Sequence, residues 1–264
     1  MTGFIGAGNM ASAMISGLVS SGTLKGEDLA AFDICTEKVK KLSEKFGLKV
    51  FESAKELAEN CDRVVLSVKP NMLEAVISPL RDIIEEKEPL VISIAAGKPL
   101  SFFEERLHGS VRLVRVMPNI NAAVGEAVSA FCPNKNATEE DVAFVGEMCR
   151  SFGTAVALSE NMFPLFGVIG GCSPAFAYMF IDAMARAAVK HGMPKAQALE
   201  ICAQAVLGSA KMILETKEHP MELTDRVCSP GGTTIEGVLS LQKNGFEAAV
   251  AAAVDAAVEK DKRL

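Results

Sequence analysis

The first half of the chain alternates short apolar runs with amphipathic stretches. The apolar runs predict strands at residues 3–5, 29–32, 63–68, 90–95 and 112–117. The amphipathic stretches predict helices from about Met10 to Ser20, over 36–46, and from about Asn71 and Leu100. The strands are nearly uninterrupted apolar runs, which is typical of strands buried on both faces. The alternation therefore predicts a parallel, doubly wound α/β sheet.

After one more strand at 154–158, the remaining pattern is helical. Helices are predicted at about 174–191, 194–215, 221–227, 233–243 and 246–262. The segments 196–214 and 248–258 are apolar on most faces, and such helices must be buried. Because one small helical domain cannot bury both, we expect them to pack against a second copy of the chain. The predicted boundary separates a first domain, 1–160, from an all-α second domain, 161–264.

The composition narrows the class of protein. Of 264 residues, 49% are hydrophobic and 23% charged, with a formal net charge of -6, as in a folded soluble protein. Neither the charge nor any basic run suggests a nucleic-acid partner. The seven cysteines are odd in number and form no C-x-x-C pair, which predicts free thiols in a reducing cytoplasm and no metal site.

One stretch resembles a membrane-spanning helix in length and composition. Residues Asn161 to Ile181 carry no charge and are about long enough to cross a bilayer. Three glycines and two prolines interrupt the stretch, so we expect two buried segments with a turn between them and no membrane. The N-terminus also lacks a signal-peptide pattern.

The first strand leads into a glycine turn and a helix. Gly6, Gly8 and Ala11 fit the spacing G-x-G-x-x-G/A, which allows a tight turn, a close approach of backbone to a pyrophosphate, and close packing of helix on sheet. A βαβ unit follows, which is the context that this motif requires. We predict a nicotinamide dinucleotide on this segment, Gly6, Ala7, Gly8, Asn9, Met10 and Ala11. The alternative is a tight turn without a ligand.

Asp33 ends the second strand, where a carboxylate can accept a hydrogen bond from the ribose 2′-hydroxyl. This position favours NADH over NADPH, although Thr36 and Lys38 are candidate partners for a 2′-phosphate. Alternatively, Asp33 only caps the next helix.

Further strand ends should meet the same rim of the sheet, because ligands of open α/β sheets lie beyond the carboxyl ends of the strands. These ends add Ser67, Val68, Lys69, Pro70, Ala95, Ala96, Gly97 and Asn119 to the predicted cofactor contacts. The small residues offer backbone to a flat ring, and the lysine and the asparagine offer donors. Each strand end by itself is equally compatible with an ordinary strand exit.

The segment S-P-G-G-T-T, residues 229–234, separates two predicted helices. Its glycines form a turn, and Thr233 and Thr234 begin the next helix, whose free N–H groups can hold a carboxylate. No general acid is present, so the substrate should not require one. A protonated imine already carries its proton, which predicts a small imine with a carboxylate as substrate. The alternative is a plain turn between helices.

Taken together, these segments resemble the pyrroline-5-carboxylate reductases over essentially the whole chain. The matching stretches are GFIGAGNMA, SVKP, AAG, RVMPN, SPAF and HPMELTDRVCSPGGTTIEG. The resemblance implies a Rossmann domain and a helical domain that interlocks two subunits, in some members within decamers. It also implies NADPH or NADH as cofactor, substrate contacts from Ser229, Gly232, Thr233 and Thr234, and a hydrogen bond from the Thr234 hydroxyl to the ring nitrogen.

The chain departs from the family pattern near the expected site, at Cys172, Ser173, Phe176, Cys228 and Ile120-Asn121. Because of these differences, a reductase of another cyclic imino acid is an alternative function. A β-hydroxyacid dehydrogenase shares the two-domain plan, but the stretch Asn161–Ile181 has no lysine for its base. A protein that senses NAD(P)H without turnover is the third alternative.

Overall fold

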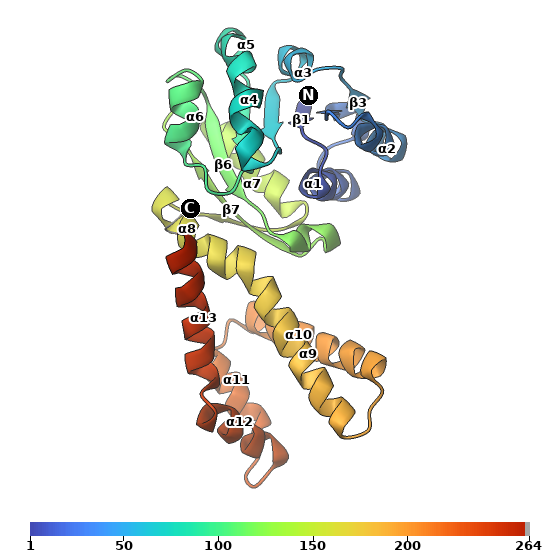
Figure 1. The fold of residues 1–264 in the computed structure, drawn as a ribbon, viewed down its shortest axis with the longest axis vertical. Coiled ribbons are helices and arrows are strands. Elements are labelled where there is room, and N and C mark those ends of the chain that lie inside the picture. The colour runs from blue at the N-terminus through green and yellow to red at the C-terminus, as the bar shows by residue number, and fades with distance from the viewer. Residues whose placement is uncertain (262–264) are drawn as a thin grey trace. The chain divides into compact units, whose positions relative to one another are not determined.

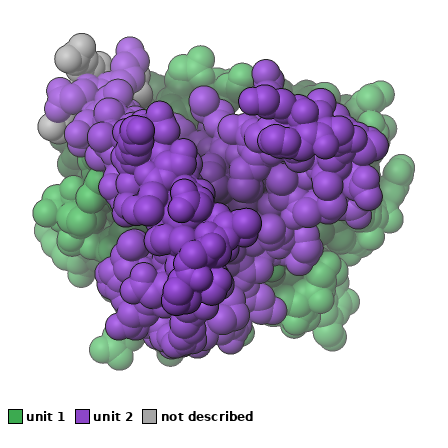
Figure 2. Space-filling view, turned by 90° about the horizontal axis from the view of Figure 1, so that it is seen from below, with its two compact units in different colours: residues 1–171, 264 green, residues 172–263 purple. Residues whose placement is uncertain are grey.

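The computed structural model describes residues 1–261, and its contacts divide them into two compact units. The first unit comprises residues 1–171 and the second begins at Cys172 (Figure 2). The sequence analysis predicts the boundary earlier, between residues 160 and 161. The chain is helical at both boundaries. That earlier boundary stays a prediction.

A single sheet runs through the first unit (Figure 1). Its strands are β1 (Thr2–Ile5), β2 (Leu29–Phe32), β3 (Lys49–Val50), β4 (Arg63–Leu66), β5 (Leu90–Ser93), β6 (Leu113–Met117), β7 (Ala127–Pro133) and β8 (Gly153–Ala157). The order is β3-β2-β1-β4-β5-β6-β7-β8. Its first six strands are parallel and have the order of a dinucleotide-binding sheet built from two mononucleotide-binding halves.

Helices cover both faces of this sheet. They are α1 (Asn9–Ser20), α2 (Thr36–Phe46), α3 (Ala54–Asn60), α4 (Leu73–Ile77), α5 (Arg81–Lys87), α6 (Leu100–Arg106), α7 (Glu139–Arg150) and α8 (Phe163–Phe166). One core cluster joins Met14 of α1 and Met148 of α7 to the sheet, and a second joins Leu57 of α3 and Phe103 of α6 to it. The predicted Rossmann-type fold is confirmed.

Two strands were not predicted from the sequence. Strand β3 has only two residues, both exposed, so it leaves no apolar run. Strand β7 pairs antiparallel with β6, placing Arg115 opposite Cys132, and β8 then pairs parallel with β7. Strands β7 and β8, which lie beyond β6, therefore run opposite to the first six strands of the sheet.

The second unit is helical throughout its described residues. Its helices are α9 (Ser173–Lys190), α10 (Lys195–Thr216), α11 (Pro220–Val227), α12 (Thr233–Lys243) and α13 (Phe246–Asp261). The all-α prediction is confirmed, and only residue 262 of the last predicted helix lies outside the described part. Ala198 is the one buried residue of α10, and no described residue of α13 is buried. These apolar helices therefore lack cover within one chain.

The expected turn within Asn161–Ile181 is wrong, because this stretch is helical throughout. Pro164 and Pro174 lie in the first turns of α8 and α9, and the backbone stays helical through both positions. The glycines between them lie in a π-helical segment, Gly167–Cys172. The stretch is also not the buried pair of segments that we expected. By length and composition the helix Glu160–Lys190 could cross a membrane, and 17% of its most apolar window is buried.

Candidate active site

The structure places a cavity at the switch point of the sheet, where β1 lies between β2 and β4. The cavity has a volume of about 330 Å³. It is lined by Ile5, Gly6, Gly8, Phe32, Asp33, Ile34, Cys35, Lys38, Ser67, Val68, Lys69, Met72 and Val76. Ligands of doubly wound sheets bind at this point, beyond the carboxyl ends of the strands.

Gly6 forms the turn that opens the cavity. Its φ is +105°, a conformation that favours glycine, and a Cβ there would lie 2.7 Å from the Ser67 carbonyl oxygen. The Gly6 N–H donates to the Phe32 carbonyl at 2.7 Å. The Ser67 hydroxyl is 2.8 Å from the Gly6 carbonyl oxygen, to which it donates. Strands β1, β2 and β4 therefore meet closely at this turn, which only glycine fits.

Gly8 serves a different purpose from Gly6. It is the N-cap residue of α1, and a Cβ there would have no atom within 4 Å. No side chain caps this helix end, and its first turn has no acidic residue. The first turn of α1 therefore has no capping side chain and no negative charge of its own, with open space beside Gly8, which suits an anion. A pyrophosphate fits this cradle, and a side chain at Gly8 would fill it.

Asp33 links the end of β2 to the glycine turn. Its Oδ2 accepts the Ala7 N–H at 2.7 Å, and its Oδ1 accepts the Cys35 N–H at 2.8 Å. Each oxygen keeps a lone pair, so the fixed carboxylate can still accept a ribose hydroxyl. The Ala7 N–H is committed to Asp33, so any contact of Ala7 with a cofactor must use another atom.

Of the predicted cofactor residues, the structure gathers Gly6, Gly8, Asp33, Ser67, Val68 and Lys69 around this cavity. The others, Ala7, Asn9, Met10, Ala11, Pro70, Ala95, Ala96, Gly97 and Asn119, do not line it. Ala11 is 1% exposed and packs helix α1 on the sheet. Their contacts with a cofactor stay predictions.

The sequence interpretation missed several lining residues, among them Ile34 and Cys35. Ile34 is 79% exposed, although large apolar side chains are usually covered. Both residues directly follow Asp33, so their position after the acidic end of the strand could have identified them from the sequence. Met72 and Val76 come from the helical turns after β4, and nothing in their spacing marks them.

The segment Ser229–Thr234 lies in the second unit. Helix α11 ends at Val227, and Gly231 has a φ of +68°. Gly232 is the N-cap of α12 and makes no side-chain cap, while Thr233 and Thr234 are exposed in its first turn. A Cβ on Gly232 would lie 2.4 Å from the Ser229 hydroxyl oxygen, so a side chain there would displace that hydroxyl. The Gly232 N–H donates to the Ser229 carbonyl at 3.0 Å, so the N–H groups that this loop can offer a ligand are those of the first turn of α12, which has no side-chain cap.

Two buried cysteines have thiols of raised pKa. Burial raises the pKa of the Cys61 thiol to about 11 and that of Cys149 to about 12, so both stay protonated at neutral pH. Cys35 and Cys172 are exposed.

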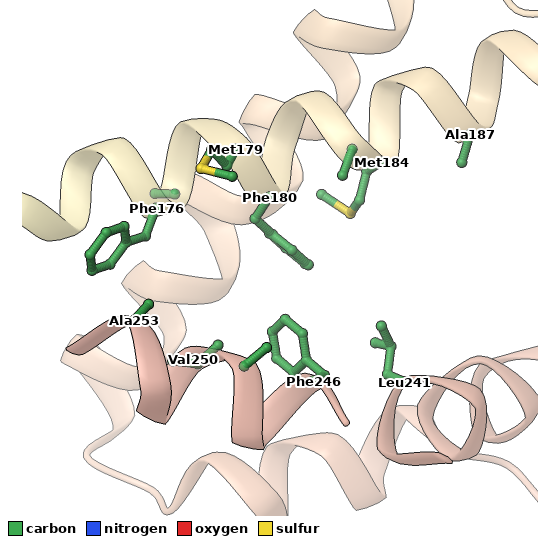
Figure 3. Close-up of a pocket in the computed structure, with 12 residues that line it drawn as sticks. Phe176, Met179, Phe180, Met184, Ala187, Leu241, Phe246, Val250 and Ala253 are labelled. Carbon is green, nitrogen blue, oxygen red and sulfur yellow. The ribbon is translucent and has the colours of Figure 1, made fainter. Parts of the chain in front are cut away.

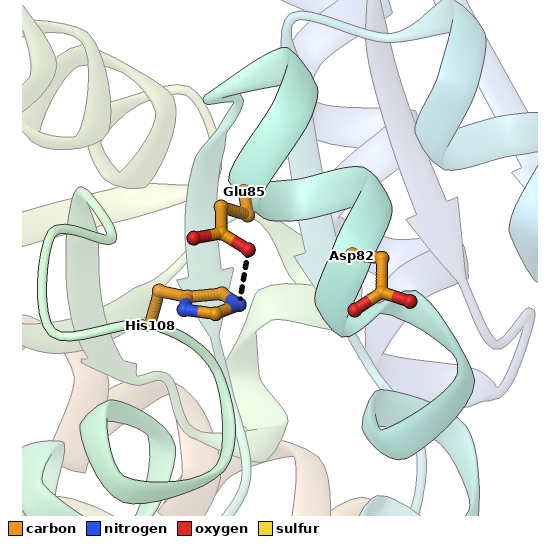
Figure 4. A group of neighbouring side chains, drawn as sticks. All are labelled: Asp82, Glu85 and His108. Carbon is orange, nitrogen blue, oxygen red and sulfur yellow. Dashed lines mark ion pairs between the residues drawn. The ribbon is translucent and has the colours of Figure 1, made fainter.

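A group of possible metal ligands lies away from the cavity, on α5 and just after α6 (Figure 4). Ligand atoms of Asp82, Glu85 and His108 lie within 4.8 Å of one another, and His108 Nε2 is 2.7 Å from Glu85. The Arg81 Nε lies 3.3 Å from the same nitrogen. Because a guanidinium at this distance opposes a cation, we interpret the group as a surface ion pair.

An apolar groove of about 690 Å³ lies within the second unit, between α9 on one side and α12 and α13 on the other (Figure 3). Phe180 and Phe246 face each other there with ring centroids 5.9 Å apart. Met179 is 72% exposed. A groove of this kind is typical of a surface that another chain covers.

Comparisons with known proteins agree along the whole chain. A family model described as pyrroline-5-carboxylate reductase dimerisation matches residues 160–264, and one described as NADP oxidoreductase, coenzyme F420-dependent, matches 1–97. The pyrroline-5-carboxylate reductase of Escherichia coli K12 is 44% identical over 99% of this chain and 97% of its own length.

Solved structures extend the agreement. A pyrroline-5-carboxylate reductase from Coxiella burnetii has a TM-score of 0.94 and 30% identity, covering 99% of this chain and 97% of its own. The Plasmodium falciparum pyrroline carboxylate reductase, solved with NADP bound, has a TM-score of 0.86 and 32% identity with the same coverage. By these similarities, the chain belongs to the pyrroline-5-carboxylate reductase family.

Proposed function

We propose that this protein is an NAD(P)H-dependent reductase that converts 1-pyrroline-5-carboxylate to L-proline, the last step of proline biosynthesis. The reaction acts on a C=N bond and makes the protein an oxidoreductase of the CH–NH class. The observation that carries the proposal is the full-length similarity to the Escherichia coli reductase, together with the glycine turn and the open start of α12.

The first unit is assigned to the cofactor, which supplies a hydride when bound. The N-terminus of α1 and the space beside Gly8 would hold the pyrophosphate. Asp33 would accept from the adenosine ribose. The remaining predicted contacts, at Ser67–Pro70, Ala95–Gly97 and Asn119, are assigned to the other half of the cofactor because they follow β4, β5 and β6.

The second unit is assigned to the substrate. The N–H groups in the first turn of α12, from Thr233 on, would bind its carboxylate, and the Ser229 hydroxyl lies beside Gly232. The Thr234 hydroxyl would accept from the protonated ring nitrogen. The imine brings its own proton, so the hydride adds to carbon and the electron pair of the C=N bond stays on nitrogen.

For the cofactor we favour NADH. The Asp33 carboxylate is held in place by two N–H donors, so it cannot turn away from a 2′-phosphate. Lys38 lines the same cavity and is the group that would favour NADPH.

The second unit supports self-association. Its dimerisation-family match, the groove and the uncovered apolar helices favour a homodimer at least, with a decamer as the larger assembly. Sedimentation tests this assignment: an active, monodisperse monomer would contradict it.

A second chain that covers the helix Glu160–Lys190 would account for the apolar surface of this helix without a membrane. We place the protein in the cytoplasm, with no nucleic-acid partner.

The direct test is oxidation of NADH and NADPH with 1-pyrroline-5-carboxylate, run beside its six-membered homologue. Faster turnover of the five-membered imine supports the proposal. Preference for the six-membered ring would indicate a different imino-acid reductase. Binding of cofactor without turnover of either imine would indicate a sensing protein.

A further inference from the structure

The start of helix α6 is capped by a residue far away in the sequence. The N-cap residue is Pro99, whose ring offers no acceptor to the free N–H groups of the first turn. That turn also has no acidic residue of its own. Instead, the Leu100 N–H donates to Oε1 of Glu160 at 2.6 Å, across 60 positions in sequence. A carboxylate at a helix N-terminus also interacts favourably with the helix dipole.

Arg115 holds this carboxylate in place. Its Nη1 donates to the same Oε1 at 3.0 Å, and its Cζ lies 4.5 Å from the centre of the buried Phe163 ring. The arginine comes from the middle of β6, where it pairs with Ser93 of β5 and with Cys132 of β7. Because a strand with neighbours on both sides is a rigid support, the Glu160 oxygen has a fixed position.

The ion pair of Arg115 and Glu160 is a costly feature for an interior. Arg115 is 6% exposed, and its Nε has no partner among the described residues. Apolar side chains of similar volume in place of such a pair are often neutral or stabilising. Stability of the fold alone therefore does not account for the pair, which points to a task at the place that the carboxylate contacts.

That place is one end of the segment that joins β5 to α6. At its other end, the Ile94 N–H donates to the Leu66 carbonyl at 3.2 Å, which ties the segment to β4. Between these two hydrogen bonds lie Ala95, Ala96 and Gly97, to which the proposed function assigns cofactor contacts. Ala96 and Gly97 are exposed, so they are open to a ligand. Every residue of this arrangement belongs to the first unit.

We propose that Glu160 is a positioning residue for the cofactor, which fixes the segment 95–97 by holding the first N–H of α6, with Arg115 as its support. The inference rests on the proposed function, which assigns one half of the cofactor to this segment. Without the hydrogen bond the segment samples more conformations, and the cofactor must order it on binding. Loss of the Glu160 acceptor should therefore weaken cofactor binding.

The test compares two double variants that both lack the buried ion pair. In Arg115→Met/Glu160→Gln, the amide oxygen of residue 160 can still accept the Leu100 N–H. In Arg115→Met/Glu160→Leu, a side chain of similar size has no acceptor. Neither variant leaves a buried charge unpaired, so both should fold. We expect the cofactor Kd of the glutamine variant within about twofold of wild type, and that of the leucine variant raised about fivefold or more.

Hydrogen exchange, followed by NMR without cofactor or substrate, reads the hydrogen bond itself. The Leu100 amide should exchange slowly in wild type and in the glutamine variant, and about fivefold faster or more in the leucine variant. Added NADH or NADPH should slow exchange at Ala96 and Gly97 in wild type. The measurements on wild type test the proposal even if the leucine variant does not fold.

Glu56→Gln and Glu56→Leu are the matched controls. The Glu56 Oε2 accepts the Glu52 N–H at 3.0 Å just before α3, which is an exposed hydrogen bond of the same kind. Neither residue lines the cofactor cavity. Both control variants should keep the cofactor Kd of wild type, and a rise in Glu56→Leu as large as that in the leucine double variant would overturn the proposal.

Three further results would overturn it. One is an equal cofactor Kd in the two double variants. Another is fast exchange of the Leu100 amide in wild type, and the third is exchange at Ala96 and Gly97 that bound cofactor leaves unchanged. The proposed function fails separately. If wild type binds the dinucleotide but reduces neither imine, that function is wrong, while the comparison of Kd values still decides the role of Glu160.

Discussion

Ala7 and Asp33 are joined by a 2.7 Å hydrogen bond from the Ala7 N–H to Oδ2 of the carboxylate. The bond fixes the glycine turn after β1 to the end of β2. A second bond, from the Cys35 N–H to Oδ1 at 2.8 Å, holds the other carboxylate oxygen. The Asp33 side chain thereby fixes the shape of the glycine turn and places a negative charge at the rim of the cavity.

Changing Asp33 to Asn should shift cofactor preference toward NADPH. The amide carries no charge, so repulsion of a 2′-phosphate at about 4–6 Å disappears, which is worth about tenfold in the ratio of kcat/KM values. Affinity for NADH should fall, since the amide leaves one of the two N–H donors without an acceptor. Steady-state kinetics with both cofactors measures this. Glu37→Gln makes the same charge change on exposed α2 and should leave the ratio unaltered; an unaltered ratio in Asp33→Asn would contradict the role of Asp33.

Gly8→Ala should weaken cofactor binding without lowering stability, whereas Gly6→Ala should lower stability. A Cβ at Gly8 meets no atom within 4 Å, so the fold should tolerate alanine while the methyl group occupies the pyrophosphate space. We expect an unchanged melting temperature and a cofactor Kd raised about tenfold or more. Gly6→Ala places its Cβ 2.7 Å from the Ser67 carbonyl oxygen at a φ of +105°, so it should lower stability. Thermal unfolding and cofactor titration separate the two, and tight cofactor binding by Gly8→Ala would rule out the cradle.

How far the sequence predicts this molecule depends on the element. Strand β2 and helices α2 and α12 were predicted to the residue. A continuous apolar run marks the strand, and glycines mark the end of α2 at Gly47 and the start of α12 at Gly232. Strand β7 was missed, since its antiparallel pairing with β6 is a tertiary choice. The turn expected within Asn161–Ile181 failed because its prolines fall in first turns and its glycines enter a π-helix.

The candidate site, too, was predicted only in part from the sequence. Gly6, Gly8 and Asp33 follow from the motif, and the structure brings them to one cavity. The hydrogen bond from Asn119 to Gly170 could not be predicted, because it joins segments whose proximity depends on the folded sheet. Equally, the commitment of the Ala7 N–H to Asp33 appears only in three dimensions.

Thr234→Ala should slow reduction without affecting the cofactor. The variant loses the hydroxyl assigned to the imine nitrogen, which is worth about 1–3 kcal/mol, or roughly tenfold to a hundredfold in kcat/KM. The dinucleotide Kd should not change, because the glycine turn belongs to the other unit. Thr234→Ser keeps the hydroxyl and most activity, and Cys228→Ser should have little effect. Wild-type rates in Thr234→Ala, or a loss that appears only as weaker cofactor binding, would refute the assignment.

Alkylation of the cysteines should report on the cofactor cavity. Cys35 is exposed and lines the cavity, so iodoacetamide should label it, and bound cofactor should protect it. Cys149 has a pKa raised to about 12 by burial, so its thiolate becomes abundant only as pH rises toward that value. At about pH 8 native Cys149 should stay unlabelled. Peptide mass spectrometry reads both sites, and equal labelling of Cys35 with and without cofactor would place the cofactor elsewhere.

Transfer of deuterium from the cofactor tests the central claim most directly. The protein is incubated with 1-pyrroline-5-carboxylate and NADH or NADPH in which both hydrogens at C4 of the nicotinamide are deuterium, and the product is analysed by mass spectrometry and NMR. Hydride addition to the imine carbon predicts proline with one deuterium at the ring carbon that was double-bonded to nitrogen. Cofactor that binds but yields no deuterated proline, with either dinucleotide, would contradict the account.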